Sequence, residues 1–336
     1  MIDFLHANRP YVIAEVGGNH GGDFETAIEY VDAAADAGAD AVKFQIYRAE
    51  RLIQADEPPL PLAGDDYDTQ YERFRELEFT TEEWQKLIST VDDRDLDFAA
   101  SAFDTQLLEF TAEKSPFIKI ASGDLTNIPL LRRARELDQP VVLSTGFATI
   151  KEIERAVSEL GTDNLVLLHC VGSYPTDEQD ANLQMINRLA ERFNVPVGYS
   201  DHTIGTLVPT AAMAMGARVV EKHFTLDKSL KVGDHRLSAT PEEMALLVDR
   251  ANRLPKMWTD QGREEAFQCE REIRENMRRS LATRNEIAAG SQIRENDLIA
   301  LRPERGISPL RYDEVVDSRS TRDLDAGILL EESDFE

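Results

Sequence analysis

Short apolar segments alternate with amphipathic segments eight times between Tyr11 and about residue 254, and this alternation restricts the fold more than any other feature of the chain. The apolar segments predict strands at residues 11–16, 41–45, 97–102, 117–120, 141–144, 165–169, 197–200 and 219–223. Helical periodicity covers residues 24–37, 81–94, 104–113, 128–136, 150–160, 181–193 and 207–215, and a last helix follows Pro241. Eight such units in about 250 residues predict an α/β fold, a closed (β/α)8 TIM barrel.

A doubly wound open sheet is the competing architecture. Such a sheet usually carries Gly-x-Gly-x-x-Gly after its first strand and gathers its polar residues at one switch point. This chain has no such glycine motif there, and polar residues end almost every strand, so the barrel is favoured. The connection from Arg48 to Phe79 is too long for a simple turn, and we expect it to lie over the barrel mouth as a lid.

A small second domain follows the barrel. We place the boundaries at residues 1–254 for the catalytic barrel, 255–279 for a charged linker containing one helix, and 280–336 for the second domain. Within that domain the pattern that begins at Glu286 recurs 37 residues later at Asp323, and Gly290 corresponds to Gly327. The repeat predicts a β-rich unit with a pseudo-twofold axis and a tight turn at each glycine.

The charge balance excludes two classes of partner. The formal net charge is -26, from 63 acidic and 37 basic residues, so nucleic acid and anionic membranes are not expected partners. No apolar run approaches the length of a membrane span, no secretory signal is evident, and two cysteines form no scaffold, which together predict a cytoplasmic protein. The excess of carboxylates over the few lysines indicates a halophilic protein in a high-salt cytoplasm. Cys170 is expected to be an inert, packed thiol.

Two histidines follow neighbouring parallel strands. His202 and His223 should emerge at the same carboxyl end of the sheet, where two imidazoles can bind one cation, although strand-end histidines can also be ordinary surface residues. With the carboxylate of Glu15, this set suits Mn²⁺, Co²⁺ or Zn²⁺, and Mg²⁺ less well. An ion pair between Glu15 and a lysine is the alternative.

Lysines and hydroxyls end several other strands. Lys43, Lys119 and Lys222 are expected in one pocket with Ser101, Ser122, Ser144, Ser200 and His169. Cationic and hydroxyl donors that converge at one point suit a phosphate or carboxylate anion. A lysine at a strand end can instead extend along apolar surface toward water.

Several motifs resemble those of one enzyme family. In chain order they are Ile13-Ala14-Glu15-Val16-Gly17, Val42-Lys43-Phe44-Gln45, Lys119-Ile120-Ala121-Ser122-Gly123, Ser144-Thr145-Gly146, Tyr174-Pro175, Tyr199-Ser200-Asp201-His202-Thr203 and Glu221-Lys222-His223-Phe224-Thr225. Together they closely resemble the N-acetylneuraminate (sialic acid) synthase family from about Tyr11 to Phe335. The last part resembles that family's antifreeze-like SAF domain, a β-clip fold.

The resemblance implies a transferase that condenses phosphoenolpyruvate with an N-acetylmannosamine-type aldose, releasing phosphate and forming a nine-carbon 2-keto acid. It implies a divalent metal, most often Mn²⁺, on His202 and His223 with Glu15 nearby. The residues implied to bind phosphoenolpyruvate are Lys43, Ser101, Lys119, Ser122 and Ser200, and those for the sugar are Asp124, Tyr174, Asp234 and Arg302. Glu15, Lys43, Lys119, His202 and His223 form the expected catalytic set. Arg302 is implied to reach the sugar site of the partner subunit, in a domain-swapped homodimer.

Three stretches depart from the family's pattern: Ala100-Ser101-Ala102-Phe103 stands where the family has Ser-Thr-Pro-Phe, Asp124 replaces a glutamate, and Gly172 replaces a polar residue. The sequence does not separate N-acetylmannosamine from its 6-phosphate or from diacetamido-trideoxy sugars. Two other functions stay open as alternatives. One is a metal-dependent pyruvate aldolase on a TIM barrel, and the other is a non-catalytic sugar-binding protein with a SAF domain.

Overall fold

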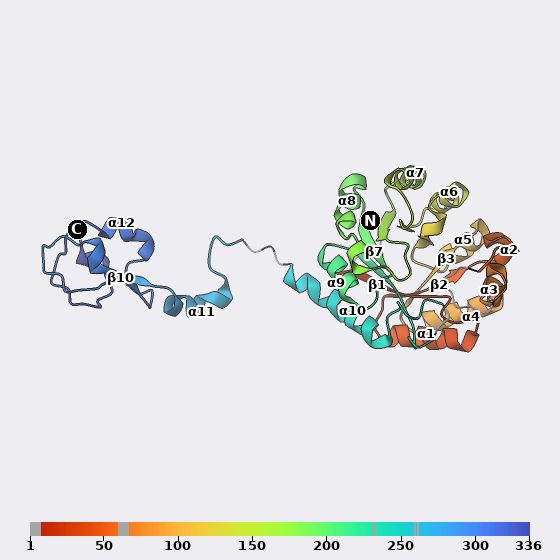
Figure 1. Ribbon diagram of the computed structural model, residues 1–336, viewed down its shortest axis with the longest axis horizontal. Helices are drawn as coiled ribbons and strands as arrows, with labels where there is room; N and C mark the ends of the chain where they lie inside the picture. Colours follow the sequence, from red (N-terminus) through yellow and green to blue (C-terminus); the bar gives the residue numbers. More distant parts are fainter. Residues whose placement is uncertain (1–7, 60–66, 231–232, 259, 261) are drawn as a thin grey trace. The chain divides into compact units, whose positions relative to one another are not determined.

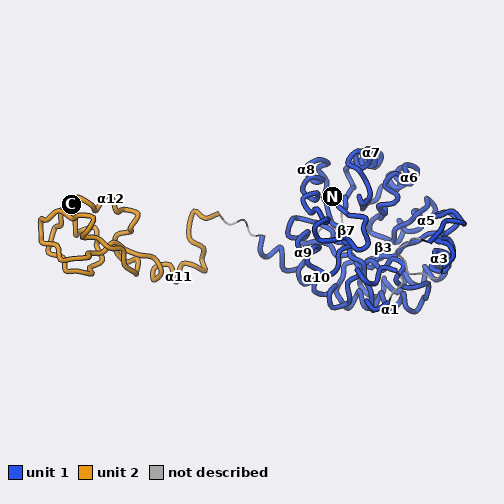
Figure 2. Tube along the Cα trace, in the orientation of Figure 1, with its two compact units in different colours: residues 1–259 blue, residues 260–336 orange. Residues whose placement is uncertain are grey.

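The chain forms two compact units, residues 1–259 and 260–336, seen in the computed structural model (Figures 1 and 2). The structure describes residues 8–59, 67–230, 233–258, 260 and 262–336. Within those ranges, no helix is long and apolar enough to cross a membrane.

The first unit is a closed barrel of eight parallel strands in chain order, in which β8 pairs with β1. The strands are β1 (Tyr11–Gly17), β2 (Ala41–Ile46), β3 (Asp97–Ala102), β4 (Ile118–Ile120), β5 (Val141–Ser144), β6 (Leu165–Cys170), β7 (Val197–Asp201) and β8 (Val219–His223). The barrel prediction is confirmed, and the open doubly wound sheet is excluded.

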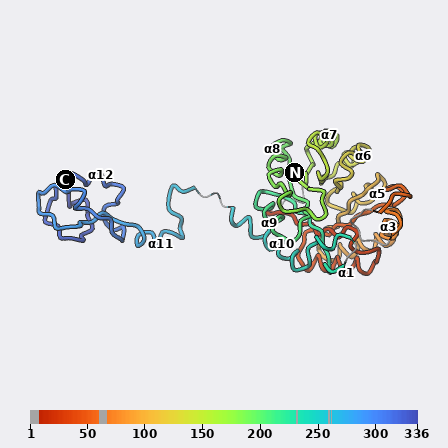
Figure 3. Tube along the Cα trace, viewed as in Figure 1, coloured from red at the N-terminus to blue at the C-terminus, as the bar shows by residue number. Residues whose placement is uncertain are grey.

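Helices surround the barrel, as the chain trace in Figure 3 shows. They are α1 (Phe24–Asp36), α4 (Thr81–Asp92), α5 (Thr105–Ala112), α6 (Ile128–Glu136), α7 (Ile150–Leu160), α8 (Gln184–Phe193), α9 (Leu207–Ala214) and α10 (Pro241–Arg253). Threonine N-caps explain where several of these helices begin. Thr80, Thr149 and Thr240 each form a capping box with a glutamate three residues later, which satisfies backbone N–H groups that the helix leaves unpaired.

Side chains alternate along each strand between the helices outside and the barrel interior. In β2, for example, Val42 and Phe44 pack in the large outer core, whereas Ala41 belongs to a separate cluster inside the barrel. That inner cluster forms an apolar floor, composed of Tyr11, Ile13, Ala41, Ala99, Phe117, Val142, Val166, Leu168 and Val219. The next inward positions, two residues further along each strand, are therefore the ones that meet above the floor.

The long connection after β2 contains two short helices, α2 (Ala49–Leu52) and α3 (Gln70–Glu76). Residues 60–66 lie outside the described residues. Helix α3 and the residue after it contribute Arg73, Phe74 and Leu77 to a pocket at the barrel mouth. The described part of the connection thus lies where the sequence predicted a lid.

The second unit contains α11 (Gln268–Met277), the antiparallel pair β9 (Ser280–Thr283) and β10 (Leu298–Leu301), and α12 (Tyr312–Val315). Its apolar core includes Leu281, Ile293 and Leu330, which are fully or almost fully buried. The unit therefore has a core of its own, separate from the core of the barrel.

The hydrogen bonds of the second unit follow the predicted repeat. Ile287 and Leu324, which occupy the same place in the two repeats, bond to each other in both directions through their backbones. Gly290 and Gly327 also correspond, and both have positive φ, +74° and +86°. Glycine adopts such angles without the steric cost that other residues meet. The predicted pseudo-twofold unit with glycine turns is confirmed.

Candidate functional site

Four charged side chains share the barrel interior directly above the apolar floor. Lys43 Nζ lies 2.6 Å from Glu15 Oε2 and 3.8 Å from Glu221 Oε1, and Lys119 Nζ lies 3.8 Å from the other oxygen of Glu221. All four are buried. The formal charges sum to zero, which is the condition under which such groups can remain ionised away from water.

The surroundings shift the pKa values of the two carboxyl groups in opposite directions. Burial raises the pKa of Glu15, because its attraction to Lys43 does not fully offset the loss of solvent. Burial also opposes ionisation of Glu221, but the combined attraction of Lys119 and Lys43 lowers its pKa below the ordinary value. Two carboxyl groups whose pKa values are separated by their surroundings can take different roles in proton transfer.

Each of the two interior lysines also donates to a hydroxyl from the next strand. Lys43 Nζ donates to Ser101 Oγ at 3.1 Å, and Lys119 Nζ donates to Ser144 Oγ at 2.8 Å. The hydroxyls help to orient the ammonium groups toward the centre of the barrel. An ammonium group held in this way can bind an anion with little further ordering.

The four charged side chains and the hydroxyls that bond to them form one layer in the barrel interior, and two more hydroxyls belong to it. Ser200 Oγ donates to Glu221 Oε1 at 3.2 Å, and Ser122 Oγ accepts from the N–H of Gly146 at 3.0 Å. A Cβ at Gly146 would lie 2.8 Å from Ser122 Oγ, so only glycine allows this approach. The layer therefore offers two ammonium groups and several hydroxyls to one ligand.

His202 and His223 lie beside this layer. Their ring centroids are 5.4 Å apart, and the ring of Tyr174 stacks on His202 at 4.0 Å. His202 Nδ1 donates to the carbonyl of Val171 at 2.8 Å, which leaves its Nε2 as the basic nitrogen. Burial lowers the pKa of His202 to about 4 and also lowers that of His223. Both imidazoles are therefore neutral at pH 7, the form that binds a metal ion.

Asp234 approaches the histidines from the loop between β8 and α10. Its Oδ2 lies 3.8 Å from Nδ1 of His223, and its backbone N–H donates to Asn19 Oδ1 at 3.1 Å. Asn19 Nδ2 in turn donates to the carbonyl of Phe224 and to Ser238 Oγ. This buried amide joins the loop after β1 to the loop after β8 and so fixes the approach of Asp234.

A pocket of about 290 Å³ opens above His223. Its polar walls come from the carboxyl ends of β2 and β8 and from the loops after β1, β6 and β8. Its apolar wall comes from α3 and the residue after it, and Phe74 of α3 meets Tyr47 edge to face at 5.1 Å. The lining residues are Gly18, Asn19, Gln45, Tyr47, Arg73, Phe74, Leu77, Tyr174, His223, Gly233 and Asp234. A pocket with both kinds of wall suits a small molecule that carries hydroxyl and apolar groups.

Two parts of the chain match known protein families. Residues 30–263 match the NeuB family. The chain belongs to the NeuB family. Residues 278–336 match the SAF domain, so the family and domain resemblance predicted from the motifs is confirmed.

Relatives of this NeuB-family chain are named for different sugar products. It is 39% identical to N,N'-diacetyllegionaminic acid synthase of Legionella pneumophila over 331 residues, 95% of this chain and 93% of the relative. It is 42% identical to N-acetylneuraminate-9-phosphate synthase of Drosophila melanogaster over 247 residues, 71% of this chain and 66% of the relative. The crystal structure of N-acetylneuraminic acid (sialic acid) synthetase of Leptospira borgpetersenii, in complex with citrate, superposes with a TM-score of 0.69 at 38% identity, covering 79% of this chain and 90% of that one.

Two residues expected in the pocket of this NeuB-family chain point away from it. Lys222 is fully buried outside the barrel, where its Nζ lies 2.7 Å from Asp201 Oδ2 and donates to the carbonyl of Thr203. His169 is also outside, with Nε2 2.8 Å from the carbonyl oxygen of Ala181. The prediction of three lysines in one pocket was therefore wrong.

Glu221 is the interior residue that sequence reasoning missed. Strand alternation could have found it: if His223 faces inward, Glu221 does as well and Lys222 does not. Its carboxylate lies 3.8 Å from both Lys43 Nζ and Lys119 Nζ, so it joins the two lysines into one charged layer.

Glu15 takes the alternative role that the sequence left open, the ion pair with Lys43. Across the described ranges, no three His, Cys, Asp or Glu side chains are grouped so that they could hold a metal ion. Lys43 lies within ion-pair distance of the Glu15 carboxylate, and a role of Glu15 beside a metal ion stays a prediction.

The structure also gives the surroundings of three further residues that the sequence analysis named. Asp124 accepts from Asn127 Nδ2 at 2.9 Å, and burial raises its pKa. Cys170 faces the site, 3.8 Å from His202 Nδ1, and burial raises its pKa to about 11, so the thiol stays protonated as expected for an inert group. Arg302 is exposed on the second unit, and its role at a barrel site stays a prediction.

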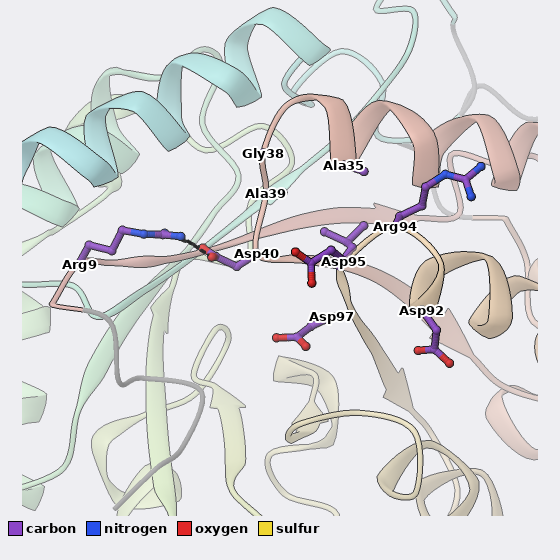
Figure 4. Close-up of a pocket in the computed structure, with 10 residues that line it drawn as sticks. Arg9, Ala35, Gly38, Ala39, Asp40, Asp92, Arg94, Asp95 and Asp97 are labelled. Carbon is purple, nitrogen blue, oxygen red and sulfur yellow. Dashed lines mark hydrogen bonds and ion pairs between the residues drawn. The ribbon is translucent and has the colours of Figure 1, made fainter.

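A second hollow lies at the opposite, amino-terminal end of the barrel (Figure 4). Asp40 there binds Arg9 through both carboxylate oxygens, at 2.8 and 2.6 Å, and Asp97 accepts from the Tyr11 hydroxyl at 2.5 Å. These bonds join the chain segments at the starts of β1, β2 and β3. Because the active sites of TIM-barrel enzymes lie at the carboxyl ends of the strands, we interpret this hollow as structural.

The buried pair of Lys222 and Asp201 predicts a large effect on stability. Lys222→Met should lower the free energy of unfolding by about 3–5 kcal/mol, because it leaves the Asp201 carboxylate buried without its cation. Lys228→Met is the matched control, since Lys228 pairs with Glu243 at a partly exposed position. Urea unfolding followed by circular dichroism measures both. Equal stability of the two variants would contradict the structural role of Lys222.

Proposed function

We propose that this protein is a nonulosonate synthase that joins phosphoenolpyruvate to an N-acyl aldose and releases phosphate. One observation supports the proposal most strongly: a pair of buried lysines lies beside a pair of neutral histidines at the carboxyl end of the barrel. The first pair suits an anion, and the second suits a divalent cation. The names of the NeuB-family relatives support the same reaction class.

Phosphoenolpyruvate is assigned to the layer of Lys43 and Lys119. The two ammonium groups would bind its phosphate and carboxylate. In the structure two glutamates balance the lysines. An incoming anion disturbs that balance, and Glu15, whose pKa is raised by burial, is the group best suited to take up a proton in response. Further hydroxyl donors would come from Ser101, Ser122, Ser144 and Ser200.

Glu221 is the residue that we propose to accept the proton lost by the attacking water. In the proposed reaction, C3 of phosphoenolpyruvate forms a bond to the aldehyde carbon, and the aldehyde oxygen takes up a proton to become a hydroxyl. Water adds at C2, and the bond from C2 to the phosphate oxygen then breaks as the new C2 hydroxyl gives its proton to the departing phosphate and becomes the keto oxygen. The water must lose a proton as it adds. Glu221 shares the layer that would bind phosphoenolpyruvate, and its carboxylate lies 3.8 Å from both lysine ammonium groups. It is therefore placed to accept that proton.

His202 and His223 fit a divalent metal ion, and Glu15 stays a proposed neighbour of that ion. Both histidines are neutral, His202 is oriented by its bond to Val171, and Nδ1 of His223 is buried without a hydrogen-bond partner among the described residues. When bound, such an ion supplies Lewis-acid polarisation of a substrate oxygen. Two imidazoles favour Mn²⁺, Co²⁺ or Zn²⁺ over Mg²⁺, and we take Mn²⁺ as the first choice.

The sugar is assigned to the pocket above His223. Tyr174 and Asp234 would contact its hydroxyls, and Asp124 stays a proposed contact. Arg302 would supply forked donors to the N-acyl oxygen from the partner subunit of a domain-swapped homodimer. We also propose a cytoplasmic location, with which two cysteines that form no scaffold agree, and a high-salt host, which the acidic composition supports.

The reaction is tested with a panel of aldoses. The purified protein is mixed with Mn²⁺, phosphoenolpyruvate and either N-acetylmannosamine, its 6-phosphate or a diacetamido-trideoxy hexose, and phosphate and 2-keto acid are measured together. We expect equal amounts of both products with one preferred sugar. Turnover with pyruvate and without phosphate release would instead identify an aldolase. No condensation with any sugar would contradict the proposal.

Removal of either histidine should abolish metal binding and turnover. In His202→Ala or His223→Ala only one imidazole remains, so Mn²⁺ affinity should fall at least about 100-fold. Isothermal titration of the protein with Mn²⁺ measures this without substrates. His169→Ala is the matched control, because that buried histidine faces away from the site. Full activity of chelator-treated His202→Ala would contradict the metal assignment.

The role of Arg302 is tested by subunit mixing. Arg302→Ala should raise the Michaelis constant for the sugar more than that for phosphoenolpyruvate. Inactive His202→Ala subunits mixed with Arg302→Ala subunits under exchange conditions should regain activity, because one site of each swapped heterodimer carries neither defect. A mixture that stays inactive would place Arg302 within its own chain's site or outside any site.

A further inference from the structure

Phe147 combines two unfavourable features at the barrel mouth. It directly follows Gly146 in the loop after β5, and 70% of the residue is exposed to solvent. Its backbone φ is +62°, in the left-handed region that a bulky residue rarely adopts. An exposed aromatic ring on a strained backbone calls for a compensating role, and such outliers gather at functional sites.

The ring of Phe147 lies against the backbone of Gly172. A Cβ at position 172 would overlap three atoms of the ring, Cδ1, Cε1 and Cζ. The ring can occupy this place only because residue 172 has no side chain. The glycine that departs from the family's pattern and the exposed phenylalanine therefore form a matched pair.

Gly172 lies within the loop that organises His202. The carbonyl of Val171, one residue earlier, accepts the hydrogen bond from His202 Nδ1 at 2.8 Å. Tyr174, two residues later, stacks on the same imidazole at 4.0 Å and lines the pocket. The loop therefore sets both the tautomer of His202 and the position of Tyr174.

We propose that Phe147 is a positioning residue, whose ring holds residues 171–174 against His202 through the contact with Gly172. Only the expected effect on kinetics rests on the proposed function. Its structural part, the fixed bond between Val171 and His202, does not require any particular substrate.

The test is a double-mutant cycle with Phe147→Ala, Gly172→Ala and the double variant. Phe147→Ala removes the ring, and Gly172→Ala displaces it, so each single change should lower kcat/KM for the sugar roughly tenfold while the KM for phosphoenolpyruvate changes little. Because both changes break the same contact, the double variant should be no worse than either single one. Leu246→Ala, a truncation of another exposed apolar residue, is the control.

A second readout is independent of turnover. The chain has six histidines, so imidazole ¹⁵N–¹H spectra of the substrate-free protein can resolve His202, assigned with His202→Gln. We expect its Nδ1–H signal to shift or broaden in all three variants, with the His169 signal unchanged. An unchanged His202 signal in Phe147→Ala, or single effects that multiply in the double variant, would overturn the proposal. If the wild-type protein condenses no sugar, the proposed function fails but the spectra still decide the positioning role.

Discussion

The pairing of four buried charges governs the interior of this barrel. Lys43, Glu15, Glu221 and Lys119 lie above an apolar floor, and each is between 2% and 7% exposed. An ionised group in such surroundings is tolerated only with a partner of opposite charge, so each side chain restricts where the others can lie. The interior is thus arranged for a ligand before any ligand binds, which is the preorganisation that anion binding and catalysis require.

The need to neutralise buried charges is met in two different places by neighbouring residues of β8. Glu221 and His223 face the interior, whereas Lys222 between them faces outward and is neutralised by Asp201. Both sets of charges are buried, but the inner one lies beside the two histidines and the pocket, whereas Asp201 of the outer pair is bonded by the Thr203 hydroxyl next to it. The chemical identity of a residue is therefore a weaker guide to its role than the face of the strand that carries it.

The fold could be predicted from the sequence because its signals are local and repeated. Eight apolar segments, capped helices and the glycine-marked repeat need no knowledge of distant contacts. Prediction failed at Lys222 and His169, where residue type was given more weight than strand alternation, and for the same reason it passed over Glu221. The pairing of Phe147 with Gly172 was beyond reach, because it joins two loops and depends on a backbone angle that no sequence pattern specifies.

The two halves of the site are built from different parts of the fold, which fits the different product names of the relatives. The half that we propose for the anion consists mostly of side chains on the strands, where each position is restricted by the floor below it and by its charged neighbours. The pocket half comes mostly from loops and from α3. Loop residues can change without disturbing the barrel, since loops tolerate substitution better than the elements they connect. We therefore expect selection among sugars to depend on Tyr47, Phe74 and Tyr174, while the lysine layer keeps the chemistry that all the sugars would share.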